Sequence, residues 1–563
     1  MRVRHVVAFL VLFAGIQSIS TYGQQVVATW TDGTGNWSNP TNWSTLTVPN
    51  NGGGTTYNVM INSPSSAVSM DLSSVVVDRL IMGNQTSMTV NTGASLNLTQ
   101  VLEFGGLADS APSFLNNGTL TLGVNASMLN FASFTNSGTF VASQGTGSVN
   151  VANIFNTSGA SLSNYGQFDN DGQMFNSGTL NNMLGAAMLN DSGRIFINSP
   201  GILNNYGLVD SGEGGGITSS GTINNYGTIS GFEGDDYAST GIVNNYGTIT
   251  NGSPGDESFH RFTATNLNNF GTVNNAAPSV PGTVGFQVTS LANYGTINNS
   301  AGGNFAASGV NYGTINNLAG PTFGDLSGST NFTLGSLTNY GVINNGAGAS
   351  LASTISLNNA GVINNSGNFL NTGTVIISSP GVFTTSSDYL QTAGATVVDG
   401  ALTATGGATI NIQGGTLGGT GTITGNVLVA GTMMPGDTPG TLTILGNYEQ
   451  SGIFDEQMSP FSQAFLDVSG NVVLDPGTLV EISLLNGFNP LGNTFSIMDF
   501  STLFGQFANG PSFWDDGFLW DVTYRQHEID VTAVQAPEPG TLLLLGVGSL
   551  ATGAFAKRKK VAK

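Results

Sequence analysis

Short alternations of apolar and polar residues recur along most of this chain, and Asn, Gly and Ser separate them. Residues 223–229 read Ile-Asn-Asn-Tyr-Gly-Thr-Ile, and residues 243–249 read Val-Asn-Asn-Tyr-Gly-Thr-Ile. Alternation with period two over such short runs is typical of β-strands, and the segments lack the apolar spacing of a helix. Asn and Gly tolerate the left-handed backbone that we expect at tight corners. The pattern therefore predicts short strands joined by sharp corners.

These segments form a repeat with a period near 20 residues. Its marker glycines are separated by 20, 20, 24, 24, 18, 28 and 20 residues, and they are Gly207, Gly227, Gly247, Gly271, Gly295, Gly313, Gly341 and Gly361. Such a repeat is typical of a solenoid, in which each unit buries its apolar face by stacking on its neighbours. The strand-type pattern predicts an all-β fold, a parallel β-helix with a mixed β C-terminal cap.

Stacking would place equivalent residues of successive repeats in columns. We expect corner Asn side chains to hydrogen-bond along the column, as amide ladders do in cross-β stacks. An aromatic column would accompany them, formed by Tyr206, Tyr226, Tyr246, Phe270, Tyr294, Tyr312 and Tyr340. These rings either pack at a corner or in the core, which is the preferred interpretation, or they stack on sugars.

Both ends of the repeat body differ from the repeats in amino-acid composition. Trp30, Trp37 and Trp43 fall within 14 residues, and we expect them to form a hydrophobic cap, with sugar stacking as the alternative. The Gly/Thr-rich segments 414–423 and 435–444 precede Phe513-Trp514 and Leu519-Trp520, which a β cap would bury. These segments resemble autotransporter passenger domains. The resemblance implies the end of a β-helix, and we expect no self-export through a membrane barrel.

The first residues predict a secretory signal peptide. Arg2, Arg4 and His5 form a positive region, residues 6–16 are apolar, and small residues follow, so we expect cleavage after Ser20 or Gly23. The predicted divisions of the chain are 1–23 signal peptide, 24–104 Trp-rich cap and first rungs, 105–385 Asn/Gly-rich repeats, 386–535 passenger-like rungs and cap, and 536–563 sorting tail.

The tail has three parts. The box Pro537, Glu538 and Pro539 comes first, and a basic cluster ends the tail, formed by Lys557, Arg558, Lys559 and Lys560. Between them lies an apolar segment near the lower length limit for a bilayer span, whose residues include Gly540, Leu542, Leu543, Leu544, Leu545, Val547, Leu550 and Phe555. The positive-inside rule keeps the basic cluster on the cytoplasmic side. A plain membrane anchor is the alternative interpretation.

This arrangement resembles the PEP-CTERM sorting tail of exported bacterial proteins. The resemblance implies recognition by an exosortase-type processing enzyme, with cleavage near the box. It also implies an exported protein of the cell-envelope surface or extracellular matrix that is transiently anchored in the inner membrane. The family is associated with exopolysaccharide and biofilm, which suggests exopolysaccharide or surface glycans as partners.

Composition excludes some functions. The chain has 32 Asp and Glu against 11 Lys and Arg, and the body between signal and tail has only Arg79, Arg194, Arg261 and Arg525 as cations. Nucleic-acid binding needs clustered cations, so we exclude it. The chain has no Cys, so its stability comes from packing and backbone hydrogen bonds rather than from disulfides.

Acidic insertions are the candidate binding loops, because long loops on one face of a solenoid often carry its site. They cover residues 213–217, 231–237 and 255–261, and their candidate residues are Glu233, Asp235, Asp236, Asp256, Glu257, His260 and Arg261. Carboxylate oxygens are Ca²⁺ ligands, but no run matches a known Ca²⁺ loop, so we expect solvated acidic loops and no cofactor.

No catalytic motif stands out, and we expect a non-catalytic protein. The body holds only His260 and His527 as histidines, and it has no nucleophile elbow, zinc-protease motif or phosphate loop. The alternative is a polysaccharide-degrading β-helix enzyme that uses loop carboxylates between residues 210 and 262. An adhesin that binds a specific glycan or protein at one localised site is a third hypothesis.

Overall fold

The structure is a computed structural model that describes residues 23–31, 33–105, 112–212, 214–231, 236–252, 261–275, 285–299, 304–318, 331–436 and 440–535. Two compact units divide the chain, Met1–Asn266 and Leu267–Lys563. In both units parallel strands stack in columns, so the predicted all-β parallel β-helix is confirmed. The predicted signal peptide and the predicted tail helix lie outside the described residues, apart from Gly23.

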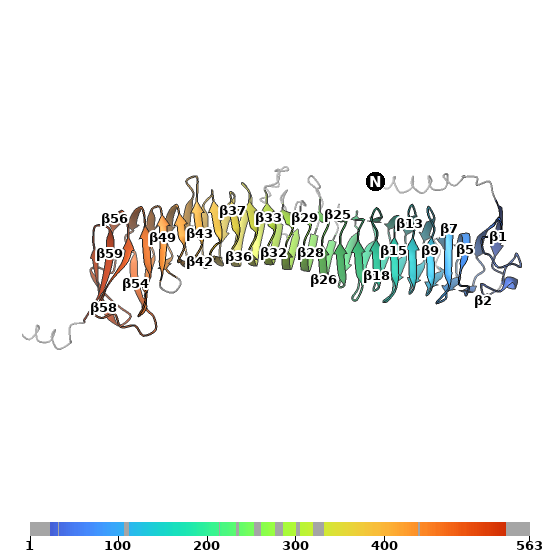
Figure 1. The fold of residues 1–563 in the computed structure, drawn as a ribbon, viewed down its shortest axis with the longest axis horizontal. Coiled ribbons are helices and arrows are strands. Elements are labelled where there is room, and N and C mark those ends of the chain that lie inside the picture. Colours follow the sequence, from blue (N-terminus) through green and yellow to red (C-terminus); the bar gives the residue numbers. More distant parts are fainter. Residues whose placement is uncertain are drawn as a thin grey trace, which may run out of the picture. The chain divides into compact units, whose positions relative to one another are not determined.

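The first unit, blue to green in Figure 1, has three strand columns. The first column contains β1 (Gln24–Thr29), β3 (Thr55–Ile61), β5 (Val75–Met82), β7 (Ser95–Phe104), β10 (Ser127–Asn130), β13 (Gly147–Asn150), β16 (Gln167–Asn170), β19 (Ala187–Asn190), β22 (Leu208–Ser211), β25 (Thr228–Gly231) and β27 (Thr248–Asn251). The second contains β2 (Thr34–Asn36), β4 (Ala67–Met70), β6 (Ser87–Val90), β8 (Ser113–Asn116), β11 (Ser133–Asn136), β14 (Asn153–Asn156), β17 (Gln173–Asn176), β20 (Arg194–Ile197) and β23 (Gly216–Ser219). The third contains β9 (Thr119–Leu122), β12 (Thr139–Ala142), β15 (Ser161–Asn164), β18 (Thr179–Asn182), β21 (Ile202–Asn205) and β24 (Thr222–Asn225).

A few elements of this unit depart from that plan. The long strand β26 (Asp236–Asn245) pairs with both β23 and β24, and so it serves the second and third columns. The strand β28 (Arg261–Asn269) begins in this unit. A short 3₁₀ helix, η1 (Pro40–Asn42), lies near the start of the unit.

The second unit, green to red in Figure 1, starts with a column of short strands beside a column of long strands. One column contains β29 (Thr272–Asn275), β31 (Thr296–Asn299), β33 (Thr314–Asn317), β35 (Val342–Asn345), β37 (Val362–Asn365), β40 (Val382–Thr385), β43 (Ala401–Ala404), β46 (Thr422–Thr424), β49 (Thr441–Leu445), β52 (Phe465–Val468) and β55 (Thr494–Asp499). Beside it lie the long strands β30 (Phe286–Asn293), β32 (Asn304–Asn311), β34 (Asn331–Asn339) and β36 (Ser350–Asn359).

After β36 the long strands split into two columns, because β36 pairs with both β38 and β39. One contains β38 (Asn368–Asn371), β41 (Tyr389–Gln391), β44 (Thr409–Ile412), β47 (Asn426–Val429), β50 (Tyr448–Gln450), β53 (Asn471–Leu474) and β56 (Thr502–Gly505). The other contains β39 (Thr374–Ile377), β42 (Ala395–Val398), β45 (Thr416–Gly419), β48 (Thr432–Pro435), β51 (Ile453–Met458) and β54 (Leu479–Leu484). Antiparallel strands follow: β57 (Ser512–Asp515), β58 (Phe518–Tyr524) and β59 (Glu528–Val534).

Interior amide ladders run along the corners, as the sequence predicts. In β24, Ile223 and Asn225 are buried, whereas Thr222 and Asn224 are half-buried. Where successive rungs both carry Asn, one amide donates to the next, as from Asn225 Nδ2 to Asn245 Oδ1 at 2.8 Å. Since the amides satisfy one another, a corner can bury a polar group without leaving it unpaired.

The marker glycines have a different role from the expected one. Gly207, Gly227 and Gly247 are not among the residues with positive φ. Instead a Cβ on Gly227 would lie 2.1 Å from the carbonyl oxygen of Gly207. Glycine is therefore needed because consecutive corners stack closer than any side chain allows, and not because the backbone is left-handed there.

The caps are mostly as expected. Trp30, Trp37 and Trp43 are fully buried and pack edge to face, so they cap the first rungs and offer no ring face to a sugar. In the last hairpin Phe513 and Trp520 are buried, but Trp514 is 62% exposed, which corrects the expectation that it packs inside. The reason is the period-two alternation of β57, which turns every second side chain outward.

Candidate functional site

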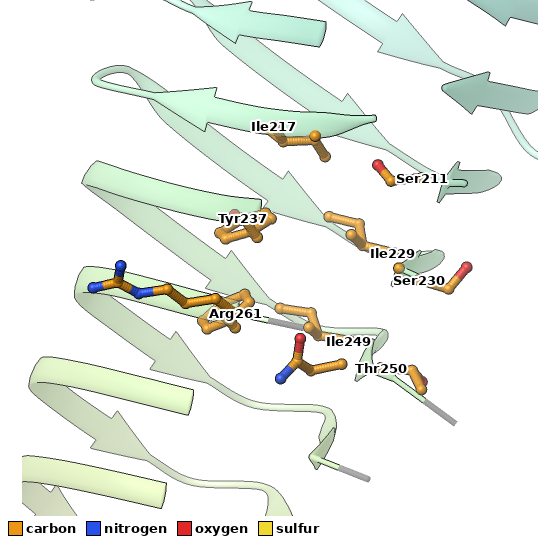
Figure 2. A pocket seen from close by; sticks show the side chains of 12 residues that line it. Ser211, Ile217, Ile229, Ser230, Tyr237, Ile249, Thr250 and Arg261 are labelled. Carbon is orange, nitrogen blue, oxygen red and sulfur yellow. The ribbon is translucent and has the colours of Figure 1, made fainter. Parts of the chain in front are cut away.

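A small cavity lies inside the first unit where the corner ladder is interrupted (Figure 2). In register along one column stand Asn190, Ser211, Gly231 and Asn251, so two rungs lack the amide. The missing side-chain volume leaves a cavity of about 30 Å³. A cavity of that size holds one or two water molecules and excludes organic ligands.

Tyr237 and Phe262 form one wall of this cavity. Their rings stack with centroids 4.3 Å apart, and the Tyr237 hydroxyl is buried without a hydrogen-bond partner. Burial raises the pKa of Tyr237, so the phenol stays neutral at physiological pH. The described residues that line the cavity therefore offer a neutral hydroxyl and include no carboxylate or imidazole.

The predicted binding loops are only partly described. Glu233, Asp235, Asp256, Glu257 and His260 lie outside the described residues, and only the backbone of Asp236 is described, as the start of β26. Arg261 starts β28 and is exposed, and Figure 2 shows its guanidinium directed away from the cavity. Two predicted loop residues prove to be buried strand residues, Ile217 in β23 and Tyr237 in β26, because each faces the interior of its rung.

Exposed aromatic ladders occupy the Tyr-Gly corners of each unit. In the first unit the ring centroids of Tyr206, Tyr226 and Tyr246 are 4.8 and 4.9 Å apart, and adjacent rings are nearly parallel. In the second unit Phe270, Tyr294, Tyr312 and Tyr340 stack in the same way. The preferred interpretation, packing at a corner, is confirmed.

The geometry of these ladders limits what they bind. The rings are 41–55% exposed, but that exposure is at their edges, since both faces of an inner ring contact neighbouring rings. Sugars stack on ring faces, so an inner tyrosine such as Tyr226 offers only its edge and hydroxyl. The ladders therefore present rows of neutral hydroxyl groups at rung spacing.

Carboxylates gather on the outer surface of the first unit. Burial, and then repulsion by Asp191 and Asp171, raise the pKa of Asp169, against the opposing hydrogen bond from Gln167. Burial and Asp191 likewise raise the pKa of Asp210, which accepts a hydrogen bond from Ser230 Oγ. Among the described residues no group of three or more His, Cys, Asp or Glu is arranged to hold a metal ion.

The second unit contains a buried carboxyl group that the sequence analysis missed. Glu456 in β51 is completely buried, and neither of its oxygens has a hydrogen-bond partner. Burial, and secondly Asp455, raise the pKa of Glu456 well above its ordinary value, which favours the protonated, uncharged form. Its position in the strand Ile453–Met458 places an acid where the alternation calls for an apolar residue, and that mismatch is a signal in the sequence.

His527 also lies in the second unit, beside a surface groove. Its Nδ1 is 3.0 Å from the carbonyl oxygen of Ser501, and the neighbouring Arg525 pairs with Glu528 and Asp530 at 2.8 and 2.7 Å. Arg525 is the only cation near the histidine among the described residues of the groove, and both of these ion pairs engage it.

Comparison with known proteins identifies the end of the chain. Residues 535–560 match the family model described as "PEP-CTERM protein-sorting motif", which includes the predicted box, apolar segment and basic cluster. No curated protein is significantly similar to the chain. No helix among the described residues is long and apolar enough to cross a membrane. The motif implies an exported protein that is sorted to the cell envelope and processed by an exosortase-type enzyme.

Proposed function

We propose that this exported β-solenoid is a non-catalytic scaffold of the cell surface or extracellular matrix that associates with exopolysaccharide. The PEP-CTERM motif supplies the route, since it delivers the chain to the envelope. The finer assignment rests on the outer surface, where neutral Asn, Thr and Tyr side chains repeat in columns from rung to rung.

One observation carries this proposal. Outward-facing amides form a second ladder in the first unit, in which Asn224 Nδ2 donates to Asn204 Oδ1 at 2.9 Å and Asn204 Nδ2 to Asn181 Oδ1 at 2.9 Å. The second unit has the same arrangement in Asn298, Asn316 and Asn344. A surface that repeats one neutral polar group suits many weak contacts along a polymer, whereas catalysis needs different groups converging on one point.

The first test follows the chain in its producing cells. The intact mass and location of the wild-type protein are compared with those of a variant that lacks residues 536–563. We expect the mature wild-type protein to have lost its tail and to fractionate with the surface or matrix. A wild-type protein that keeps its tail and stays in the inner membrane would contradict the sorting step.

The second test addresses association and catalysis together. Protein purified from the culture is mixed with the exopolysaccharide of the same cells, and both co-sedimentation and newly formed reducing ends are measured. We expect co-sedimentation without new reducing ends. Absence of co-sedimentation would overturn the scaffold proposal, and a steady rise in reducing ends would favour the polysaccharide-degrading alternative.

A further inference from the structure

Corner lengths alternate in one part of the first unit. The link from β12 to β13 has four residues, 143–146, and the link from β18 to β19 also has four, 183–186. Between them the link from β15 to β16 has only Tyr165 and Gly166. Because β12, β15 and β18 are consecutive strands of one column, the Tyr165 corner is recessed between two longer corners.

This recess is a surface groove of about 640 Å³, lined by residues 144–147, 165–167 and 184–185. Its volume falls within the range of small-molecule sites, about 300–1,000 Å³. Asn125 supports one wall, since its backbone N–H donates to the carbonyl oxygen of Gln144 at 3.2 Å. A corner of four residues held in this way gives the groove a fixed edge.

Tyr165 differs from the ladder tyrosines in its surroundings. It has the same Asn-Tyr-Gly corner and 41% exposure, yet no aromatic ring among the described residues stacks on it. The neighbouring Leu184 is 86% exposed, so an apolar side chain lies open to solvent on one wall. The groove therefore combines an aromatic ring free of aromatic stacking with an uncovered aliphatic group.

The polar groups of the groove select an uncharged ligand. Gln144 and Gln167 carry amides that both donate and accept hydrogen bonds. No cation is among the described residues that line the groove, and the Gln167 amide donates to the carboxylate of Asp169 at 2.8 Å, so the nearby charge is negative. An anionic ligand would be repelled, and a ligand with apolar faces and hydroxyl edges fits both parts of the lining.

We infer that this groove binds a sugar ring of a neutral polysaccharide. The apolar C–H face of the ring covers Tyr165 and Leu184, since the negative face of an aromatic ring attracts such groups. The hydroxyl groups of the sugar exchange hydrogen bonds with the Gln144 and Gln167 amides. This assignment rests on the proposed polysaccharide association and names a site for it.

The test is affinity electrophoresis of the purified protein in native gels. The gels contain hydroxyethylcellulose, dextran, alginate or the exopolysaccharide of the producing cells. Three variants are compared with wild type: Tyr165→Ala, Leu184→Glu and Tyr226→Ala. Tyr226 is the matched control, since it has a similar exposure but aromatic rings stack on both of its faces. If Tyr165→Ala disturbs the fold of its corner, Leu184→Glu still tests the groove, because the exposed Leu184 makes almost no buried contact.

We expect the wild-type protein to be retarded by at least one neutral polysaccharide and not by alginate. Tyr165→Ala and Leu184→Glu should weaken that binding about tenfold, and Tyr226→Ala should change it less than about twofold. Retardation that is equal in wild type, Tyr165→Ala and Leu184→Glu would overturn the groove assignment and leave the scaffold proposal standing. A wild-type protein that no polysaccharide retards, the exopolysaccharide included, would overturn both.

Discussion

Loss of one interior amide should destabilise its rung far more than loss of one surface amide. Asn156 is fully buried in β14, and its Nδ2 donates to Asn176 Oδ1 at 2.7 Å and to the carbonyl oxygen of Thr179 at 3.0 Å. It also accepts from Asn136 Nδ2 at 2.8 Å. The substitution Asn156→Ala removes all three hydrogen bonds.

The substitution affects the hydrogen-bond partners of Asn156 unequally. Asn136 Nδ2 keeps its hydrogen bonds to the carbonyl oxygens of Gly138 and Ser161, whereas Asn176 Oδ1 loses its amide donor. An orphaned buried acceptor costs about 1–3 kcal/mol. The cavity left by the amide adds about 1 kcal/mol. The expected loss of local stability is therefore about 2–4 kcal/mol.

Native-state hydrogen exchange measures this loss where it occurs. In a solenoid each rung contacts mainly its neighbours, so a global unfolding midpoint would dilute the effect. Backbone amides of residues 130–180 should exchange about 30-fold to several hundred-fold faster in Asn156→Ala than in wild type.

The control is the surface ladder of the same unit. Asn204 is half-buried, so water replaces its two ladder hydrogen bonds in Asn204→Ala, and we expect a local loss below about 1 kcal/mol. Equal acceleration of exchange around the two sites would refute the reasoning, since burial would then have no influence on the cost. So would an Asn156→Ala variant with unchanged exchange.

Three further changes probe other parts of the chain. Burial raises the pKa of Glu456 above its ordinary 4.5, so the folded state keeps a proton that the unfolded chain loses, and stability should fall as pH rises above that value. Glu456→Gln should flatten this slope in thermal unfolding from about pH 4 to about pH 9, and an unchanged slope would contradict the assignment. Gly227→Ala should cost about 2–3 kcal/mol of local stability in native-state hydrogen exchange, because its Cβ would lie 2.1 Å from the Gly207 carbonyl oxygen. Gly147→Ala is its control, with nothing within 4 Å and an expected gain of up to about 1 kcal/mol, and equal costs would contradict the stacking argument. Glu538→Ala should leave the protein unprocessed in its producing cells, as an increase in intact mass would show, and normal processing would show that Glu538 is not required.

Much of the fold follows from the sequence because the repeat converts sequence spacing into spatial contact. In a parallel stack the neighbour of Asn225 in space is the residue one repeat away, Asn205 or Asn245. The amide ladders and the aromatic ladders therefore needed only the repeat and the alternation of each strand. The sorting motif was readable for a different reason, since it is a linear signal that requires no folded body.

The candidate sites were less predictable. The acidic loops were predicted as binding sites because their residues are charged, and most of those residues lie outside the described part of the chain. The groove at Tyr165 depends on differences between adjacent corners, although Asn164-Tyr165-Gly166 repeats the corner motif and could have indicated it. Its ring has no aromatic stacking partner among the described residues, because the longer corners on either side, 143–146 and 183–186, contain no aromatic residue.

The sequence by itself determined the strand type, the parallel stacking, the ladders and the export route, because each depends on local alternation, a regular period or a linear signal. Only the tertiary structure decided which polar groups lack hydrogen-bond partners and which glycines lie too close to a neighbouring carbonyl group to carry a side chain. Gly227 is confined by a carbonyl group 20 residues earlier, and Glu456 is isolated by the rungs packed around it. Those properties depend on how one rung deviates from the next, and a repeat describes only what the rungs share.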